Sequence, residues 1–406
     1  MKNAKYLLLP IFLVVFIDNF GYALVFNMLG PMLLKTEYGM MAASTSVHLR
    51  NAILALIFGV FPLAQFFAAP LIGEFADIYG RKKAFTISLL GMTLGFCLSA
   101  WAIFLHSVAG FFLSRLLTGL FAGNIGICMA SIADLSPDER VRGKNFSTVT
   151  ALFGISWVAA MVLGGYIANP KVLGYLGPVY AFLFVGILTL INFFLILGMY
   201  KETAPKRFSQ KFYFWQGIEN IMETLILKES KVYFIAYFLW SLGWVIAVQW
   251  YPAYSIEVFQ ASVSSFSTWY ILMGMTWILG SLFAKHYLFN KYSTIHIGMF
   301  GFAAMTMSLF LMQWMGIFTL FSIFFVIGSF FSVFAMSASL NLISLSAPNK
   351  VQGKIMGISQ SIQSFAFVLV SAIAFLVSIY ALSILFYFAA FISLAGLGML
   401  FYQAKK

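Results

Sequence analysis

Asp18 and Arg115 stand inside long apolar runs of this 406-residue chain. Such a charge costs about 2.5–3.5 kcal/mol at the centre of a membrane helix, unless the side chain meets a partner or a wet interior. Burial favours the neutral form of a carboxyl, so Asp18 could bind and release a proton near neutral pH. Tyr22 follows one helical turn later on the same face. We predict that Asp18, Tyr22 and Arg115 form a proton-coupling or substrate site.

Both charged residues also have a structural interpretation. Asp18 could pair with Arg115 and serve only to hold two helices together. Arg115 lies only a few residues into its apolar run, so its long side chain could extend to the nearer membrane interface. The spacing alone leaves these alternatives open.

A second group of polar residues ends the second apolar run. Gly73 permits close approach of a neighbouring helix, and Gly80 permits a tight reversal of the chain. Asp77 would be costly at a helix end unless paired, and Arg81 is its nearest partner in sequence. A basic anchor alone would explain Arg81, but it would not explain Asp77 or the two glycines.

A weaker set of candidate residues lies on three of the later predicted helices. An aromatic wall would suit an amphipathic or aromatic substrate, including an organic cation. Aromatic residues make up 18% of the chain, so lipid-facing or core positions are the alternative. The predicted cavity-lining residues are Trp240, Trp244, Tyr251, Phe334, Ser337, Asn341 and Gln360.

The elements that carry these residues follow from composition. The chain is 62% hydrophobic and 9% charged, whereas a soluble domain is roughly 45–50% apolar and about 25% charged. These values exclude a water-soluble fold and a disordered chain. We predict an all-α integral membrane protein with twelve spans. The predicted spans are 5–34, 50–78, 83–105, 107–135, 141–168, 175–199, 231–258, 264–285, 294–313, 316–345, 352–378 and 381–402.

The positions of the cations orient these spans. If the N-terminus lies in the cytoplasm, the opposite side holds only Lys35, Arg50 and Lys171 of the 24 Lys and Arg residues, and Arg115 lies within a span. Cytoplasmic loops carry an excess of Lys and Arg. The sequence therefore predicts a multi-pass protein of the cytoplasmic (inner) membrane with both termini cytoplasmic. The net charge of +12 then belongs to a membrane face rather than to a nucleic-acid surface.

An internal repeat suggests two related halves. The tetrapeptide 141–144, Val-Arg-Gly-Lys, returns 210 residues later at 351–354 as Val-Gln-Gly-Lys. Repeated bundles of this kind occur in transporters, with the substrate site between them near the membrane midplane. We predict a six-helix bundle over 1–199, a cytoplasmic linker with an interfacial amphipathic helix over 200–230, and a second bundle over 231–406.

Several of these motifs resemble those of the major facilitator superfamily. The run from Gly73 to Lys83 matches the family's cytoplasmic signature except at Ile78, and the run from Arg115 to Gly123 resembles a second signature. By this resemblance, Asp77 and Arg81 would join Asp134 in closing a cytoplasmic gate. In drug–proton antiporters with the second signature, the Arg is associated with proton transfer.

The resemblance extends to the tetracycline-efflux branch. An Asp commonly occupies the depth of Asp18 in the first span of that branch, followed, as here, by Gly21. The antiporter signature of the fifth span keeps Gly164-Gly165, but Ala160-Met161 replaces its usual Gly-Pro. This departure leaves import or uncoupled transport open.

We therefore predict a secondary transporter that moves a small organic solute by alternating access, coupled to protons, with efflux of an amphipathic, drug-like compound favoured. The alternatives are a proton-coupled importer of an amino acid, sugar or metal-chelate, and a membrane receptor that does not transport. Enzyme motifs such as His-Glu-x-x-His and the P-loop are absent from the sequence. We expect a functional monomer in the lipid bilayer, with no enzymatic activity, cofactor, metal site or nucleic-acid partner.

Overall fold

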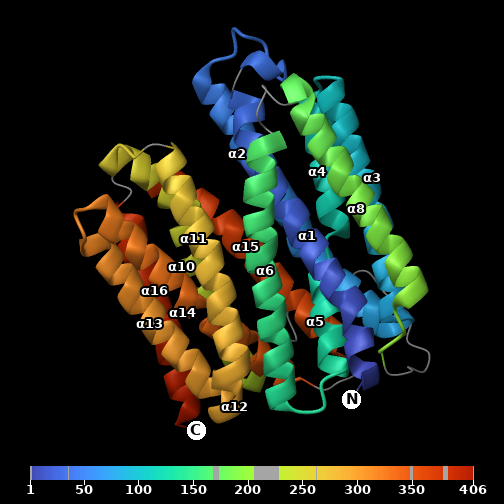
Figure 1. The fold of residues 1–406 in the computed structure, drawn as a ribbon, viewed down its shortest axis with the longest axis vertical. Helices are drawn as coiled ribbons and strands as arrows, with labels where there is room; N and C mark the ends of the chain where they lie inside the picture. The colour runs from blue at the N-terminus through green and yellow to red at the C-terminus, as the bar shows by residue number, and fades with distance from the viewer. Residues whose placement is uncertain are drawn as a thin grey trace. The chain divides into compact units, whose positions relative to one another are not determined.

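The computed structural model describes residues 2–34, 36–167, 173–204, 228–261, 263–347, 351–377 and 383–405, and nearly all of them are helical (Figure 1). The helices up to residue 199 are α1 Lys2–Leu34, α2 Val47–Tyr79, α3 Arg81–Phe104, α4 Val108–Phe121, α5 Asn124–Asp134, α6 Glu139–Ile167 and α8 Gly177–Met199, with short 3₁₀ turns η1 Thr36–Tyr38 and η2 Gly174–Leu176. The later helices are α10 Lys228–Phe259, α11 Val263–Phe283, the π-helical turn η3 Ala284–Leu288, α12 Phe289–Lys291, α13 Thr294–Trp314, α14 Phe318–Leu345, α15 Gln352–Val377 and α16 Ser383–Ala404. The predicted all-α, twelve-span fold is confirmed.

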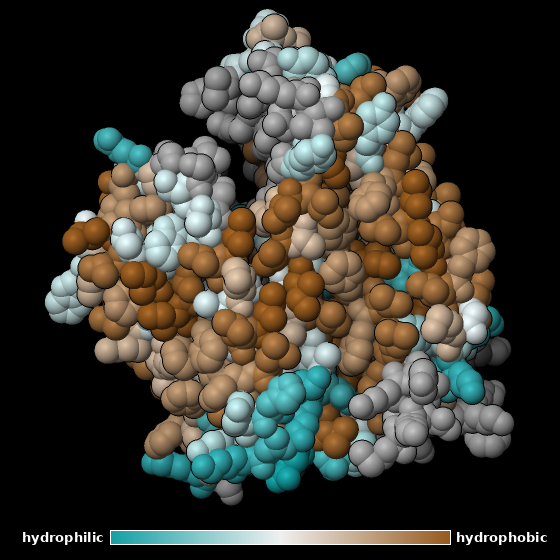
Figure 2. Space-filling model, viewed as in Figure 1, coloured by the Kyte–Doolittle hydropathy of each residue, from teal (hydrophilic) through white to brown (hydrophobic). Residues whose placement is uncertain are grey.

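Apolar composition makes these helices suited to lipid. Within the described ranges, nine helices are long and apolar enough to cross a membrane, and α1 adds the shorter apolar stretch Leu8–Leu24. Figure 2 shows hydrophobic residues over the sides of the helices and hydrophilic residues gathered at the end where α6 begins. Because lipid offers no hydrogen bonds to the backbone, helices satisfy their own N–H and C=O groups.

Contacts divide the described helices into two compact units. Unit 1 consists of α1 to α5, α6 from Ser156 onward, α8, and α15 up to Ser364. Unit 2 consists of α6 up to Ile155, α10 to α14, α15 from Phe365 onward, and α16. Two helices, α6 and α15, thus contribute their first part to one unit and their remainder to the other.

The predicted domain boundaries, at 199/200 and 230/231, concern the two halves of the sequence and stay a prediction. The proposed amphipathic helix of the linker lies outside the described residues.

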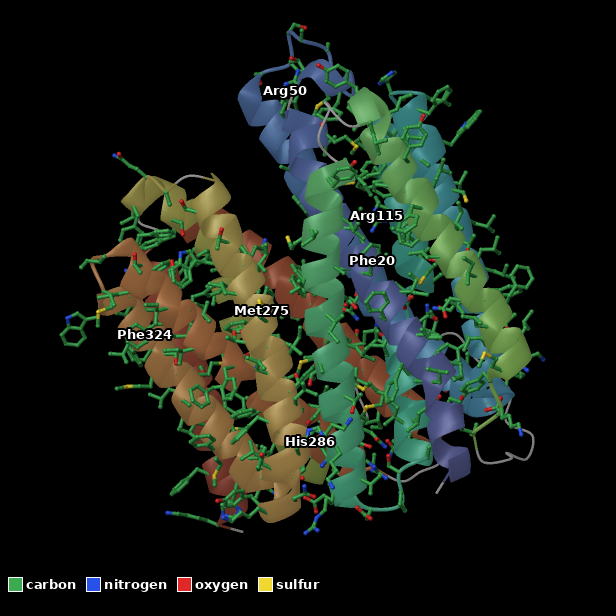
Figure 3. All side chains as sticks on the ribbon, viewed as in Figure 1. Phe20, Arg50, Arg115, Met275, His286 and Phe324 are labelled. Atoms are coloured by element: carbon green, nitrogen blue, oxygen red, sulfur yellow. The ribbon has the colours of Figure 1, made fainter. Side chains whose placement is uncertain are left out.

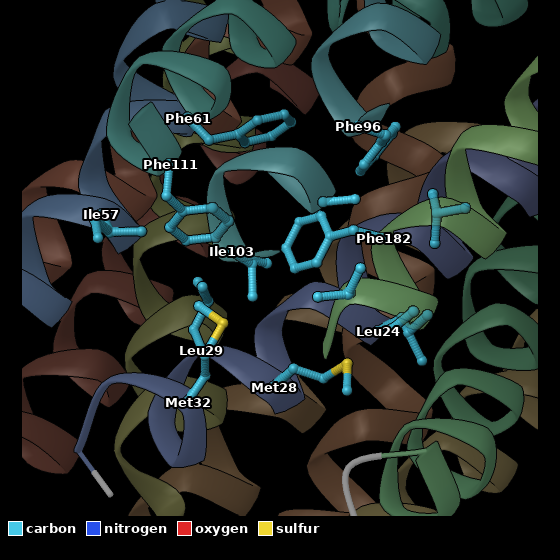
Figure 4. Close-up of a cluster of buried hydrophobic side chains, with 14 of the residues drawn as sticks. Leu24, Met28, Leu29, Met32, Ile57, Phe61, Phe96, Ile103, Phe111 and Phe182 are labelled. Carbon is cyan, nitrogen blue, oxygen red and sulfur yellow. The ribbon is translucent and has the colours of Figure 1, made fainter. Parts of the chain in front are cut away.

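Unit 1 has a core of aliphatic and aromatic side chains. Phe61, Phe96, Phe111 and Phe182 come from α2, α3, α4 and α8 and face one another in Figure 4. Helix α3 packs along α8 beside this core, as Figure 1 shows. The buried aromatic rings fill the space between helices that glycines bring close together.

The core of unit 2 is aromatic. Tyr251 of α10 stacks on Phe325 of α14 with 4.2 Å between ring centroids. Trp244, also on α10, stacks on Phe325 as well, with 5.9 Å between ring centroids. Their neighbour Trp240 donates from Nε1 to Ser332 Oγ at 2.8 Å. The predicted aromatic stripe is therefore packed against α14, and the Tyr251 hydroxyl group also bonds to α14, at 2.6 Å from Ser322 Oγ.

The fourth predicted span is broken. The sequence had predicted one continuous helix over 107–135. Helix α4 ends at Phe121, Ala122 and Gly123 are not helical, and α5 begins at Asn124. A break leaves backbone carbonyl and N–H groups without partners in their own helix. Side chains from three other helices replace those partners, as described below.

Arg50 closes the turn between α1 and α2 (Figure 3). Its side chain is 4% exposed and donates to the carbonyl oxygens of Leu33, Ala42 and Thr45 at 3.3, 2.6 and 3.2 Å. A cation near the last carbonyl groups of α1 also complements the helix dipole. Arg50 therefore holds the end of α1, the connecting loop and the start of α2 together.

Replacing Arg50 with Met keeps the length of the side chain and removes all its donors. We expect a loss of about 1–3 kcal/mol in the free energy of unfolding, because buried carbonyl groups lose their partners. Thermal unfolding of the purified protein should show a lower midpoint temperature. Arg140→Met is the control, since Arg140 is exposed. Equal midpoints for the two variants would contradict this role.

Candidate functional site

Asp18 is a partly buried residue of α1. Oδ1 of its carboxyl is buried, and the first residue of α5 after the break in the fourth span is Asn124, whose Nδ2 donates to Met92 Sδ at 3.1 Å. The thiol of Cys128, one turn further along α5, donates to the Ile11 carbonyl of α1 at 3.7 Å. Asn124 is fully buried. Sequence analysis did not select it, although an Asn within an apolar run is the kind of signal that had identified Asp18.

Arg115 of α4 is enclosed by aromatic rings. Its side chain is 3% exposed, and its guanidinium carbon lies 4.8, 5.7 and 5.9 Å from the ring centroids of Phe61, Phe96 and Phe182. Aromatic faces attract a guanidinium and partly replace the water it loses on burial. Arg115 therefore packs inside unit 1, as Figure 3 shows, rather than extending along α4 to solvent.

Tyr22 lies one helical turn after Asp18 on α1. Its ring centroid is 5.7 Å from that of Phe61, the ring that Arg115 also contacts, and 6.4 Å from that of Trp157. No ion pair joins Asp18 to Arg115 among the described residues. The structure thus brings Tyr22 and Arg115 to the same ring, that of Phe61, and it does not pair Asp18 with the arginine among the described residues.

The second predicted group comes together around Arg81 at the start of α3. Arg81 Nη1 lies 2.5 Å from Asp77 Oδ1, and Nε lies 3.3 Å from Asp134 Oδ2. The Arg81 side chain is 0% exposed. A guanidinium taken out of water is stabilised when good hydrogen bonds satisfy it, and the two carboxylates supply them here.

Gly73 and Gly80 have the local roles that their positions suggested. A Cβ on Gly73 would collide with the backbone of Gly353 in α15. Gly80 joins α2 to α3 with φ of +101°, a conformation that residues with a side chain rarely adopt. These two positions let α15 approach α2 and let the chain turn before Arg81.

Asp77 also binds the start of α15 within unit 1. The backbone N–H of Gly353 donates to Asp77 Oδ1 at 2.9 Å, and that of Lys354 donates to Oδ2 at 2.8 Å. A carboxylate at this end of a helix satisfies free N–H groups and complements the helix dipole. One carboxylate therefore links Arg81 to the first turn of α15.

Glu202 extends this cluster, and sequence analysis missed it. Its carboxylate accepts hydrogen bonds from the backbone N–H groups of Arg81 and Lys82, at 2.9 and 3.1 Å. Gly80, the residue before α3, has no side chain to make this cap. The acid lies just beyond the sixth predicted span, and an acidic residue within a basic segment was the signal that could have found it.

Tyr200 and Thr203 connect the same segment to α5. The Tyr200 hydroxyl group bonds Ser131 at 2.8 Å and Thr203 at 2.9 Å, and Thr203 Oγ1 donates to Asp134 Oδ2 at 3.3 Å. Burial raises the pKa of Tyr200 above its ordinary value, which keeps the phenol protonated. These bonds order the chain after α8 beside Arg81.

The weaker predicted residues divide between the units. Phe334, Ser337 and Asn341 are 0% exposed on α14 in unit 2, where Asn341 donates to Thr294 Oγ1 at 2.9 Å. Gln360 lies in unit 1 and bonds the break between α4 and α5. Their cavity-lining role, like that of Trp240, Trp244 and Tyr251, stays a prediction.

Long apolar helices with a carboxyl group and an enclosed guanidinium in their interior define an integral membrane protein with ionisable groups at membrane depth, which is typical of transporters. Among the described residues, no cluster of His, Cys, Asp and Glu could hold a metal ion. The model of the Major Facilitator Superfamily matches residues 11–371. The chain belongs to this family of transporters, and it is therefore not an enzyme.

Similar proteins within the family cover only parts of the sequence. The class E tetracycline resistance protein of Escherichia coli is 30% identical over 153 residues, which are 38% of this chain and 35% of that protein. The bovine major facilitator superfamily domain-containing protein 10 is 32% identical over 117 residues, which are 29% of this chain and 25% of that protein. Each alignment thus spans about a third or less of the relative.

Solved structures match the whole fold. The human organic anion transporter MFSD10 superimposes with a TM-score of 0.83 at 18% identity, covering 98% of this chain and 99% of that one. The proton:xylose symporter XylE gives a TM-score of 0.76 at 15% identity, covering 97% and 94%. At these identities the similarity establishes the fold, which in this family consists of two six-helix bundles.

Glu202 offers a direct test of the cap on α3. We expect Glu202→Ala to lower the free energy of unfolding by about 0.5–2 kcal/mol, as the loss of a helix N-cap does. Glu202→Gln keeps an acceptor oxygen, so it should lose less. Thermal unfolding of both variants beside the wild type measures the difference. A Gln variant as unstable as the Ala variant would assign the effect to charge rather than to the cap.

Proposed function

We propose that this protein is a proton-coupled exporter of an amphipathic organic compound in the cytoplasmic membrane. The observation that carries the proposal is the buried carboxyl oxygen of Asp18, which forms no ion pair with Arg115 among the described residues. A carboxyl that is not committed to a permanent ion pair is free to gain and lose a proton during a transport cycle. Similarity to tetracycline resistance proteins supports efflux.

Arg115 and Tyr22 complete the proposed site. The aromatic rings around Arg115 keep a cation in an apolar interior without a carboxylate partner among the described residues. Arg115 and Tyr22 both pack on the ring of Phe61, and a positive charge there can attract an anionic group of the solute. We infer that Asp18 carries the proton and that Arg115 and Tyr22 take part in the transfer or in binding.

The cluster around Arg81 is the proposed cytoplasmic gate. Asp77 bonds both Arg81 and the first turn of α15, and Asp134 bonds Arg81 from α5. In alternating access, the gate must close while the opposite side is open and release in the other state. These contacts stabilise the state in which the cytoplasmic side is closed. The protein acts as a monomer, with both termini in the cytoplasm.

Proton-coupled import is the second candidate. The bovine proton-coupled folate transporter is 30% identical over 150 residues, which are 36% of this chain and 32% of that protein. Exporter and importer differ in whether solute and proton cross in opposite directions or together. The sign of the proton movement therefore separates them.

Proteoliposomes with a pH-sensitive dye inside and equal pH on both sides test both candidates. Tetracycline and folate are the probes, each added outside. We expect tetracycline to make the lumen more alkaline, because inward solute flow drives protons out through an antiporter. The Asp18→Asn variant should lose this response, while Asp138→Asn, which changes an exposed carboxyl, keeps it. Acidification would establish symport instead, and an unchanged Asp18→Asn response would exclude Asp18 as the coupling residue.

The gate is tested in the same vesicles with Arg81→Ala. Removing one partner of a buried ion pair costs about 3–5 kcal/mol, so the closed state should be depopulated. We expect the initial rate of tetracycline-driven alkalinisation to fall by about tenfold or more. Lys83→Ala is the matched control, since Lys83 belongs to the same basic run but is exposed. Equal rates in the two variants would show that Arg81 does not form a gate.

A further inference from the structure

Arg115 stands apart from the other buried arginines that the structure describes. Arg50, Arg81 and Arg142 each donate a hydrogen bond to an oxygen atom of the protein. Arg115 makes no hydrogen bond or ion pair with any described residue, and its Nη1 atom is buried without a partner. Burial of a charged group is costly unless hydrogen bonds replace those of water. The donors of Arg115 therefore lack a partner in the described interior of unit 1.

Three rings support the charge of Arg115 without using these donors. The guanidinium carbon lies 4.8, 5.7 and 5.9 Å from the ring centroids of Phe61, Phe96 and Phe182, which belong to the cluster of Figure 4. A ring face attracts a positive charge, but it is only a weak acceptor for an N–H group. Oxygen anions are strong acceptors, because the planar guanidinium presents its N–H groups as a fork that two carboxylate oxygens match. The rings thus hold the cation in place and leave the fork for an anion.

Tyr22 and Trp157 form a half-buried edge of the same cluster. The ring centroid of Tyr22 lies 5.7 Å from that of Phe61 and 6.4 Å from that of Trp157, while Phe61 itself is 7% exposed. Aromatic rings pack well against further rings in offset or edge-on contacts at about 4.5–7 Å. An aromatic solute that packs beside Tyr22 and Trp157 is next to Phe61, and so it is close to the guanidinium that Phe61 supports.

An organic cation finds less support in the described interior. In the aromatic stripe of unit 2, Tyr251 lies nearly parallel to Phe321 and Phe325, with 5.5 and 4.2 Å between ring centroids. Trp244 likewise stacks on Phe325. Rings that stack in this way offer their faces to one another rather than to a cation. In unit 1, an ammonium group near the rings around Arg115 would be repelled by the guanidinium.

We propose that the transported solute is an aromatic organic anion and that the N–H fork of Arg115 binds its carboxylate or other oxygen anion. The inference rests on the proposed function, since it assumes a solute site in the interior of unit 1, and it narrows that solute to one class of charge. Tyr22 and Trp157 pack against the ring of the solute. Phe61 and the two rings beside it hold the guanidinium ready, so that no described carboxylate has to be displaced first.

Calorimetric titration of the purified protein at neutral pH tests the charge of the solute. Naphthoate is the probe, and the matching naphthamide has the same ring and shape without the charge. We expect the wild type to bind naphthoate at least tenfold more tightly, because a charge-assisted hydrogen bond is stronger than a neutral one. Micelles without protein give the blank for each probe. Equal affinities, or no binding of naphthoate, would overturn the inference.

Three variants test whether Arg115 carries the preference. Arg115→Met keeps the apolar length of the side chain and should bind naphthoate and naphthamide equally. Arg115→Lys keeps the charge but loses the fork, so it should keep only part of the preference. Arg140→Met is the matched control, since Arg140 is exposed, and it should behave as the wild type does. A full preference for naphthoate in Arg115→Met would show that another group binds the anion. If that variant does not fold, Arg115→Gln replaces it.

The failure of this inference and that of the proposed function are distinguishable, because the titration contains no pH gradient. Tighter binding of naphthylmethylammonium than of naphthoate would assign the solute to the organic cations and contradict the anion site, while proton coupling through Asp18 would stand. Naphthoate binding that depends on Arg115, together with no pH change that depends on Asp18 in the vesicles, would refute the proposed coupling and leave the anion site intact.

Discussion

Hydrocarbon provides no hydrogen bonds, so every polar group inside this protein has to find its partner within the protein. The constraint is strongest where a helix stops inside the apolar body, as α4 does at Phe121. There, Ser88 donates to the carbonyl of Phe121, and two glutamines donate to that of Ala122. The interior of unit 1 is arranged around this requirement: polar side chains lie where the backbone or a charge would otherwise be unsatisfied.

The two repeated tetrapeptides show how the same local sequence meets this constraint in different ways. Both begin a helix, α6 or α15, and both place their glycine against a neighbour: Gly143 against Phe289, and Gly353 against Gly73. In the first turn of α6, the N–H of Val141 donates to Oδ1 of Asp138, the residue just before the helix, at 2.8 Å. The first turn of α15 instead depends on Asp77 of α2. A helix end that is capped by a residue of another helix loses its cap when the two helices separate.

The sequence was sufficient to predict what depends on hydrophobicity and on local spacing. Apolar runs located the helices, and the spacing of Asp77 and Arg81 placed an ion pair that the structure shows at 2.5 Å. Prediction was weaker where a distant residue decides the structure. Gly123 suggested close helix packing, but whether the helix breaks there depends on Gln65 and Gln360, which lie far away in sequence. Similarly, Glu202 caps α3 across 121 residues, a relation that no local pattern contains.

Arg115 illustrates why an ionisable residue at membrane depth needs its surroundings before its role can be argued. From sequence, a pair with Asp18 and an extension to the membrane interface were both reasonable. The rings of Phe61, Phe96 and Phe182 support a cation through their faces, and no ion pair joins it to Asp18 among the described residues. A permanent ion pair would bind the carboxylate in its charged form and oppose protonation. Because aromatic rings rather than a carboxylate stabilise the guanidinium, the acid and the base of the proposed site can each change partner during a cycle.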